Sequence, residues 1–141
     1  MSETPILFDC EAAPLLGILH RPRQLQGTTG VVLVVGGPQY RVGSHRQFTQ
    51  LARELAAAGF ASLRFDYSGM GDSEGVDHDF SATRDDLGAA LAALDSVVAG
   101  IDRFVLWGLC DAASSAMMFA HEYERISGLV LLNPWVHGEG H

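Results

Sequence analysis

The chain has 141 residues, of which 48% are hydrophobic and 18% are charged. This length has room for one domain, and the apolar content is enough for a packed core, which excludes a disordered chain. The net charge is -8, and no basic stretch could neutralise successive phosphates or bind an anionic membrane surface, so neither nucleic acid nor a membrane is an expected partner.

The first predicted elements are strands. Two short apolar runs at residues 6–8 and 15–19, split by Ala13-Pro14, predict an opening pair of strands. Residues 31–35 form a continuous and mostly β-branched apolar run, which is typical of a strand buried on both faces of a parallel sheet. The glycines and the proline at residues 36–38 predict the end of this strand.

Helical spacing begins after this strand. Ser44 with Gln47 three residues later is a capping-box pattern, and Gly59 predicts the end of the helix. The later elements are expected as a strand at 60–65, a glycine-rich loop at 66–75, a helix at about 81–98, a strand at 104–107, a helix at about 110–123 and a strand at 128–132. This alternation predicts an α/β fold with a mostly parallel sheet, right-handed crossovers and helices on both faces.

The strongest chemical signal surrounds Cys110. A predicted strand leads into Gly108-Leu109-Cys110-Asp111-Ala112, and a predicted helix follows at once. This is the nucleophile-elbow pattern G-x-S-x-G with cysteine for serine and alanine for the second glycine, and small flanking residues are needed because the turn is tight. The helix dipole would favour the thiolate of Cys110. The alternative is a small buried hydrophobic cysteine, but the position after a buried strand favours the elbow.

Two backbone N–H groups must face the developing oxyanion in an acyl-transfer site. Asp111, directly after the nucleophile, would supply one of them. The segment around residues 35–39 resembles the H-G-G-P-G turn of proline iminopeptidase-like hydrolases, with Val35 in place of the histidine, and this resemblance gives the second donor role to Gly37. Pro38 has no N–H to donate. An ordinary turn at the end of a strand is the alternative for this loop.

The glycine-rich loop at 66–75 looks like the D-x-R-G-x-G-x-S turn of many α/β-hydrolases, with Ser68 in place of the arginine. We expect it to shape the edge of the site without a catalytic role. Asp66, Asp72 and Glu74 leave a cation site open as an alternative to a solvated acidic loop.

These motifs, in this order, resemble the α/β-hydrolase superfamily over nearly the whole chain. Residues 36–48 and 107–114 are similar to a narrower group, exosortase A system-associated hydrolase 1, which is found beside exopolysaccharide and protein-sorting genes in Gram-negative bacteria. The resemblance implies a cytoplasmic hydrolase. It also implies that residues 1–141 are the N-terminal portion of one α/β-hydrolase domain, truncated after about the sixth strand, with the later strands and the lid absent.

A hydrolase triad also needs an acid and a histidine. The resemblance implies that both lie on loops after later strands, beyond this chain. The chain's own histidines are weak candidates for the base: His20, His45, His78, His121, His137 and His141. The expected catalytic residues are therefore Cys110, Asp111 and Gly37.

The compartment and the cofactors are predicted from what the sequence lacks. No basic segment precedes an apolar run at the N-terminus, and no apolar stretch approaches the roughly 20 residues that span a bilayer, so we expect a cytoplasmic location. Cys10 and Cys110 are too few for a disulfide scaffold. No cysteine or histidine spacing fits a zinc site, and we expect neither a metal nor another cofactor.

The leading functional hypothesis is a hydrolase of ester, thioester or acyl-transfer type that acts on a small-molecule acyl substrate. A dienelactone-hydrolase-like enzyme and a non-catalytic interaction domain or inactive fragment are the alternatives. A nucleotide-binding protein is disfavoured because no G-x-G-x-x-G or Walker pattern follows the first parallel strand. A homodimer is left open, since the edge of a sheet can pair with another chain.

Overall fold

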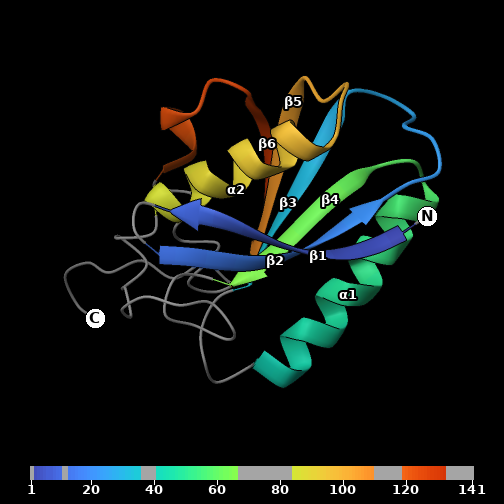
Figure 1. Cartoon of the computed structure of the whole chain (residues 1–141), viewed down its shortest axis with the longest axis horizontal. Helices are drawn as coiled ribbons and strands as arrows, with labels where there is room; N and C mark the ends of the chain where they lie inside the picture. Colours follow the sequence, from blue (N-terminus) through green and yellow to red (C-terminus); the bar gives the residue numbers. More distant parts are fainter. Residues whose placement is uncertain (1, 11–12, 36–40, 67–83, 110–118, 133–141) are drawn as a thin grey trace.

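The computed structural model describes residues 2–10, 13–35, 41–66, 84–109 and 119–132 (Figure 1). These residues form one six-stranded sheet with helices. The elements in chain order are β1 (Ser2–Cys10), β2 (Ala13–Arg21), β3 (Thr29–Val35), α1 (Arg41–Ala57), β4 (Ala61–Asp66), α2 (Arg84–Val97), β5 (Arg103–Leu109), the 3₁₀ turn η3 (Ala120–Glu122) and β6 (Ile126–Leu132).

The order of the strands across the sheet is β1-β2-β4-β3-β5-β6. β1 pairs with β2 antiparallel and β2 pairs with β4 antiparallel, whereas β3 is parallel to both β4 and β5, and β6 is parallel to β5. The predicted mostly parallel sheet with an opening strand pair is confirmed.

The central strand β3 is buried on both faces, as its sequence predicts. Val31 and Leu33 face α1, and they form an apolar cluster with Ala52 of that helix. Val32 and Val34 face the other way and join the larger core cluster, which includes Leu87, Leu94 and other residues of α2. α1 and α2 therefore cover opposite faces of the sheet, which confirms the prediction of helices on both faces (Figure 1).

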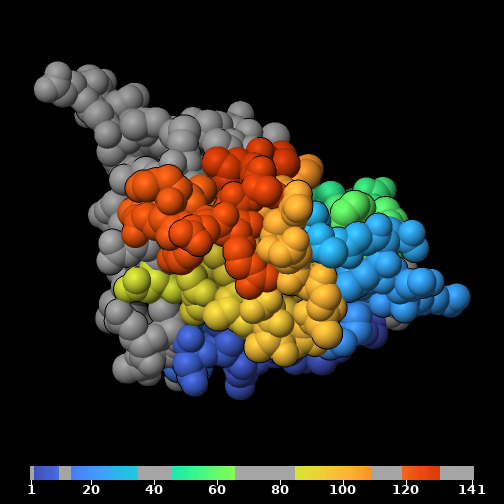
Figure 2. All heavy atoms as spheres, turned by 90° about the horizontal axis from the view of Figure 1, so that it is seen from above, coloured from blue at the N-terminus to red at the C-terminus, as the bar shows by residue number. Residues whose placement is uncertain are grey.

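The face of the sheet that α2 covers is also covered by a second segment next to this helix. In the view from above, α2 lies between β1 and the segment 119–132 (Figure 2). Phe119, Tyr123 and Ile126 of that segment pack against the core cluster. A Cβ atom at Gly88 of α2 would lie 2.8 Å from the Tyr123 hydroxyl, so the absence of a side chain there allows the close approach.

The end of α1 is a Schellman motif. The N–H of Gly59 donates to the carbonyl of Ala56 at 3.0 Å, and the N–H of Phe60 donates to the carbonyl of Leu55 at 2.8 Å. Gly59 has a φ of 96°, which favours glycine. The predicted helix end at Gly59 is confirmed.

The predicted start of α1 is wrong. The helix begins at Arg41, so Ser44 lies inside its first turns and is not the cap. The nearest proline upstream is Pro38, and Gly43 costs a helix only about 1 kcal/mol, so no residue between 41 and 43 prevents helix formation. The helix predicted at about 81–98 is described from Arg84 to Val97. Of the helix predicted at about 110–123, the described part is only the turn η3.

Most strands are longer than their apolar runs. β1 includes polar residues at both ends because it pairs with β2 along its full length, from Ser2 opposite Arg21 to Cys10 opposite Ala13. Backbone pairing stabilises these end residues independently of their side chains. The predicted boundaries are therefore too narrow for every strand except β4, which is predicted at 60–65 and observed one residue later, at Ala61–Asp66.

Arg125 anchors the start of β6 against the turn before β5. Its guanidinium donates to the carbonyl oxygens of Ile101 and Asp102 at 2.7 and 3.0 Å, and to Asp95 Oδ1 at 2.9 Å. It also lies 4.9 Å from the centre of the Phe104 ring, within the range of a cation–π contact. The hydrogen bond from Arg125 to the Asp95 carboxylate lowers the pKa of Asp95.

We predict that Gly17→Ala destabilises the fold. An added Cβ would lie 2.8 Å from Leu63 Cδ1 and 3.2 Å from the Arg64 carbonyl oxygen, so a buried side chain and the β4 backbone would have to shift. The expected loss is about 1–3 kcal/mol of unfolding free energy, measured by urea denaturation.

Gly27→Ala is the matched control, because nothing lies within 4 Å of its added Cβ. It should change the unfolding free energy by less than about 0.5 kcal/mol. Equal effects of the two substitutions would contradict the packing described at Gly17.

Candidate active site at the carboxyl edge of the sheet

Four parallel strands end together at one edge of the sheet, here called the carboxyl edge. Val35 of β3 lies opposite Asp66 of β4, and Leu109 of β5 lies opposite Leu132 of β6. β3 and β5 are also neighbours. The chain segments that follow these four strands therefore all leave the sheet at the edge where open α/β sheets bind ligands.

The predicted site residues Gly37, Cys110 and Asp111 lie outside the described residues. The structure shows where their segments are attached and does not describe their side chains or mutual distances. Gly37 is the second residue after β3, and Cys110 directly follows Leu109, so its Cα is about 3.8 Å from the end of β5. Both segments start from neighbouring strands at the carboxyl edge, which is compatible with an elbow and an oxyanion donor from the next loop.

The strand that leads to Cys110 is buried, as predicted. Phe104 and Leu106 of β5 are 2% and 0% exposed and belong to the core cluster. Gly108, two residues before Cys110, is also buried and lies between Val34 of β3 and Leu131 of β6.

The described histidines do not lie at the carboxyl edge. His20 is opposite Ser62, four residues before Asp66, which places it roughly 13 Å below that edge at 3.3 Å per residue. His121 is exposed in η3, which precedes β6 and therefore lies toward the opposite edge. The backbone of His45 lies near the start of α1, but its side chain, like all of His78, His137 and His141, lies outside the described residues.

Sequence reasoning missed the buried polar groups. Asp86 is 2% exposed in the first turn of α2, where a negative charge is stabilised by the helix dipole. His20 is fully buried in β2, and Ser62 is fully buried beside it in β4. The alternation of β2 carried a signal for His20, since it shares a face with Ile18 and Leu16 and must point toward a helix.

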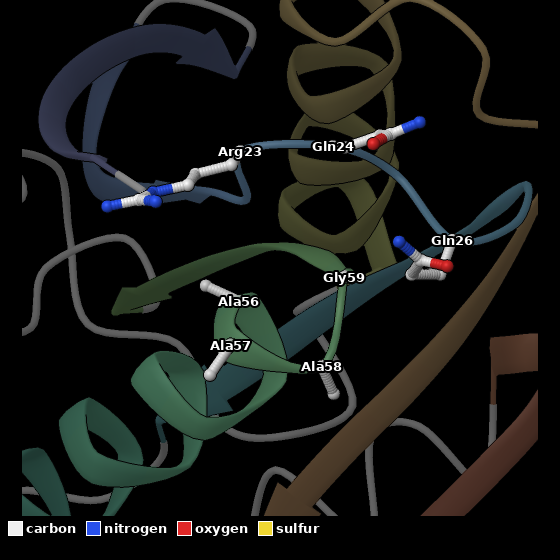
Figure 3. A pocket seen from close by; sticks show the side chains of 7 residues that line it. All are labelled: Arg23, Gln24, Gln26, Ala56, Ala57, Ala58 and Gly59. Carbon is white, nitrogen blue, oxygen red and sulfur yellow. The ribbon is translucent and has the colours of Figure 1, made fainter.

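A broad depression lies away from the candidate site, between the loop after β2 and the C-terminal end of α1 (Figure 3). Its volume is about 840 Å³, and Arg23, Gln24, Gln26 and residues 56–59 line it. Gly59 lies two residues before the start of β4, so the depression is at the amino ends of the parallel strands. We do not assign chemistry to it, because the reacting groups of such sheets gather at the carboxyl ends.

Two kinds of site are absent from the part of the chain that the structure describes. Within it, no three or more histidine, cysteine, aspartate and glutamate side chains are placed together so that they could hold a metal ion. None of its helices has the length and apolar character needed to cross a membrane.

Known proteins resemble this chain in sequence and fold. It is 28% identical over 141 positions to the quorum-quenching protein AidA of Acinetobacter baumannii, in an alignment that covers 94% of this chain and 44% of that protein. Its structure matches the α/β hydrolase GrgF from Penicillium sp. sh18 with a TM-score of 0.82 and 19% identity, over 99% of this chain and 48% of GrgF.

A third match is an α/β serine hydrolase without a lid from Xanthomonas campestris, with a TM-score of 0.76 and 20% identity, over 99% of this chain and 66% of that one. The chain thus spans about half to two thirds of the length of these relatives. The family profile described as "Serine aminopeptidase, S33" matches residues 27–140, which include all the parallel strands. The chain belongs to this serine aminopeptidase S33 family, within the α/β-hydrolase superfamily.

Proposed function

We propose that the protein to which these residues belong is an acyl hydrolase that uses Cys110 as its nucleophile. The observation that carries this proposal is the course of β5, a buried parallel strand that ends one residue before Cys110 at the carboxyl edge. Its neighbour β3 ends two residues before Gly37 at the same edge. Membership of a hydrolase family supports the same chemistry.

In the proposed reaction the Cys110 sulfur attacks the acyl carbon of an ester or thioester. The N–H groups of Gly37 and Asp111 hold the negative oxygen of the tetrahedral intermediate, which collapses to an acyl-cysteine and releases the alcohol or thiol. A histidine takes the thiol proton and passes it to the leaving group, and water then releases the acid. We propose that this histidine and its orienting acid come from polypeptide outside these 141 residues.

The cysteine changes the chemistry relative to a serine hydrolase such as the Xanthomonas relative. A thiol has a pKa of about 8.5 and is partly ionised near neutral pH, whereas a serine hydroxyl is not, so Cys110 depends less on a general base. We propose a small-molecule acyl compound as the substrate, because a partly ionised thiol can attack its acyl carbon. The link to exosortase systems, the cytoplasmic location and a homodimer remain proposals that rest on the sequence alone.

The rival proposal is a non-catalytic interaction domain with a hydrolase fold. It is favoured by one observation: among the histidine side chains that the structure describes, none lies at the carboxyl edge. A scaffold would need no activated thiol at position 110, so the reactivity of this cysteine separates the two proposals.

We predict that Cys110 reacts with iodoacetamide with a pH midpoint below the free-thiol value of about 8.5, because the start of the following helix would stabilise the thiolate. The rate is measured by mass spectrometry in a Cys10→Ser background, so that a single thiol remains. Cys10→Ser with Cys110→Ala is the blank. An unshifted midpoint or no reaction would favour the scaffold.

We also predict that an activated ester such as p-nitrophenyl acetate leaves one acyl group on the chain, on Cys110. Because we propose that the catalytic histidine comes from outside these residues, deacylation should be slow and the adduct should accumulate. Intact-mass analysis after a timed incubation should show the adduct in the Cys10→Ser variant and no adduct when Cys110→Ala is added to that variant. The chain contains no lysine. An adduct that persists without Cys110 would therefore mean that another surface group reacts and that Cys110 is not the nucleophile.

A further inference from the structure

His20 lies at the centre of a polar cluster that crosses three strands, in which His20 and Ser62 are buried and Glu3 is exposed. It is opposite Glu3 of β1 and opposite Ser62 of β4 in the pairing register, so these three residues form one row across the sheet. The His20 side chain is fully buried. The row faces α1, because Arg53 of that helix reaches Glu3.

The hydrogen bonds determine the protonation state of the His20 ring. Arg64 Nε donates to His20 Nε2 at 3.0 Å, so Nε2 must keep its lone pair. The ring proton is then on Nδ1, which lies 3.3 Å from Glu3 Oε2 but is not aligned for a good hydrogen bond. The imidazole ring of His20 is therefore neutral in this structure.

Glu3 extends the cluster to the helix. Arg53 donates from Nε and from Nη2 to the two Glu3 carboxylate oxygens, at 2.6 and 3.1 Å. This hydrogen bonding lowers the pKa of Glu3, which keeps its negative charge at mildly acidic pH. The contacts Arg64–His20–Glu3–Arg53 thus join β4, β2, β1 and α1 through one histidine ring.

A proton on Nε2 would disrupt this arrangement. It would turn the acceptor of the Arg64 bond into a donor and would place a positive ring 3.0 Å from a guanidinium. Burial, followed by the charge of Arg64, lowers the pKa of His20, and the opposing attraction of Glu3 is weaker. The described charged groups that face the ring are Arg64 from β4, Glu3 from β1 and Arg53 from α1.

The number of paired residues shows which strand pairing would separate first. β1 and β2, here called the N-terminal strand pair, are joined by nine residue pairs, from Ser2–Arg21 to Cys10–Ala13. β2 is joined to β4 by only four, from Gly17–Phe65 to His20–Ser62. The His20–Arg64 bond crosses this shorter seam, so a proton on His20 weakens the seam and leaves the N-terminal strand pair intact.

We propose that the N-terminal strand pair is an acid-sensitive arm, which opens from β4 as one unit when His20 takes up a proton. Opening separates Phe8 from its edge-on contact with the Phe65 ring, at 5.9 Å between ring centres, so the closed form dominates at neutral pH. Leu15 and Leu19 of the arm belong to the apolar core, so the closed form is also held by core packing, and the proton on His20 is the trigger that opposes it.

The direction of the pH effect follows from the lowered pKa. In the open form the His20 pKa returns toward its ordinary value of about 6.5, so the open form binds the proton more tightly. The advantage of the closed form is complete above about pH 6.5 and is lost as the pH falls toward the lower pKa of the closed form. One proton changes the opening constant by at most about tenfold for each pH unit.

Hydrogen exchange of the full chain, read by mass spectrometry between about pH 5 and pH 7.5, tests the proposal. After correction for intrinsic exchange rates, peptides from residues 2–10 and 13–21 should lose protection together as the pH falls, by up to about tenfold per pH unit. Peptides from β3 and β5 should keep theirs. Protection of the arm that is independent of pH, or loss in all strands at the same pH, would overturn the proposal.

His20→Gln tests the trigger, because a glutamine oxygen can accept the Arg64 bond and does not titrate in this range. The pH dependence of the arm should disappear in this variant and persist in His121→Gln, which changes an exposed histidine. If His20→Gln does not fold, proton NMR titration of the wild-type histidines replaces it. A histidine resonance that titrates with the opening of the arm supports the proposal, and the absence of any such resonance overturns it.

Discussion

The parallel pairing of β3 with β4 on one side and β5 on the other is the constraint on which the rest of the structure depends. Parallel strands need crossover connections, and here those connections place α1 and α2 on opposite faces of the sheet. All of Val31–Val34 is buried as a result, with exposed fractions of at most 5%. Reacting groups are thereby confined to the segments that leave the sheet at its ends.

The register of these strands also determines where the candidate site can form. β3, β4, β5 and β6 end level with one another, so the segments that carry Gly37 and Cys110 start from neighbouring positions. A slip of one residue would move the attachment point of Cys110 by about 3.3 Å and would turn every β5 side chain to the other face. Such a slip would replace the buried Phe104 and Leu106 with the differently shaped Val105 and Trp107 on the core face, so packing opposes it.

The antiparallel strands β1 and β2 are attached to the rest of the sheet partly through polar side chains. They extend the sheet beyond β4, where α1 covers only part of the surface, and they bring a histidine, a glutamate and two arginines into one cluster. The buried His20 ring accepts its hydrogen bond from Arg64 only while Nε2 carries no proton. The same residues that attach this arm to the core therefore make its attachment dependent on pH.

The residue pattern alone predicted most of the architecture, because apolar periodicity reflects burial directly. The apolar run at residues 31–35, the helix at about 81–98 and the helix end at Gly59 are all local signals. Residues 31–34 are buried, α2 is described from Arg84 to Val97, and the turn at Gly59 ends α1. The predicted start of α1 at Ser44 is wrong, because a capping-box pattern does not exclude helical residues before it. The elbow at Cys110 stays a prediction, since its residues lie outside the described part of the chain.

By itself, the sequence determined the class of fold, the order of the elements and the strand that leads to Cys110, since each depends on residues close together in the chain. Only the tertiary structure decided that His20 is a neutral, buried ring rather than a surface histidine. Its partners Glu3 and Arg64 stand 17 positions before it and 44 after it, and Arg53 reaches the same cluster from a helix. Protonation depends on which charges surround a group in space, and only the pairing of the strands brings these charges together.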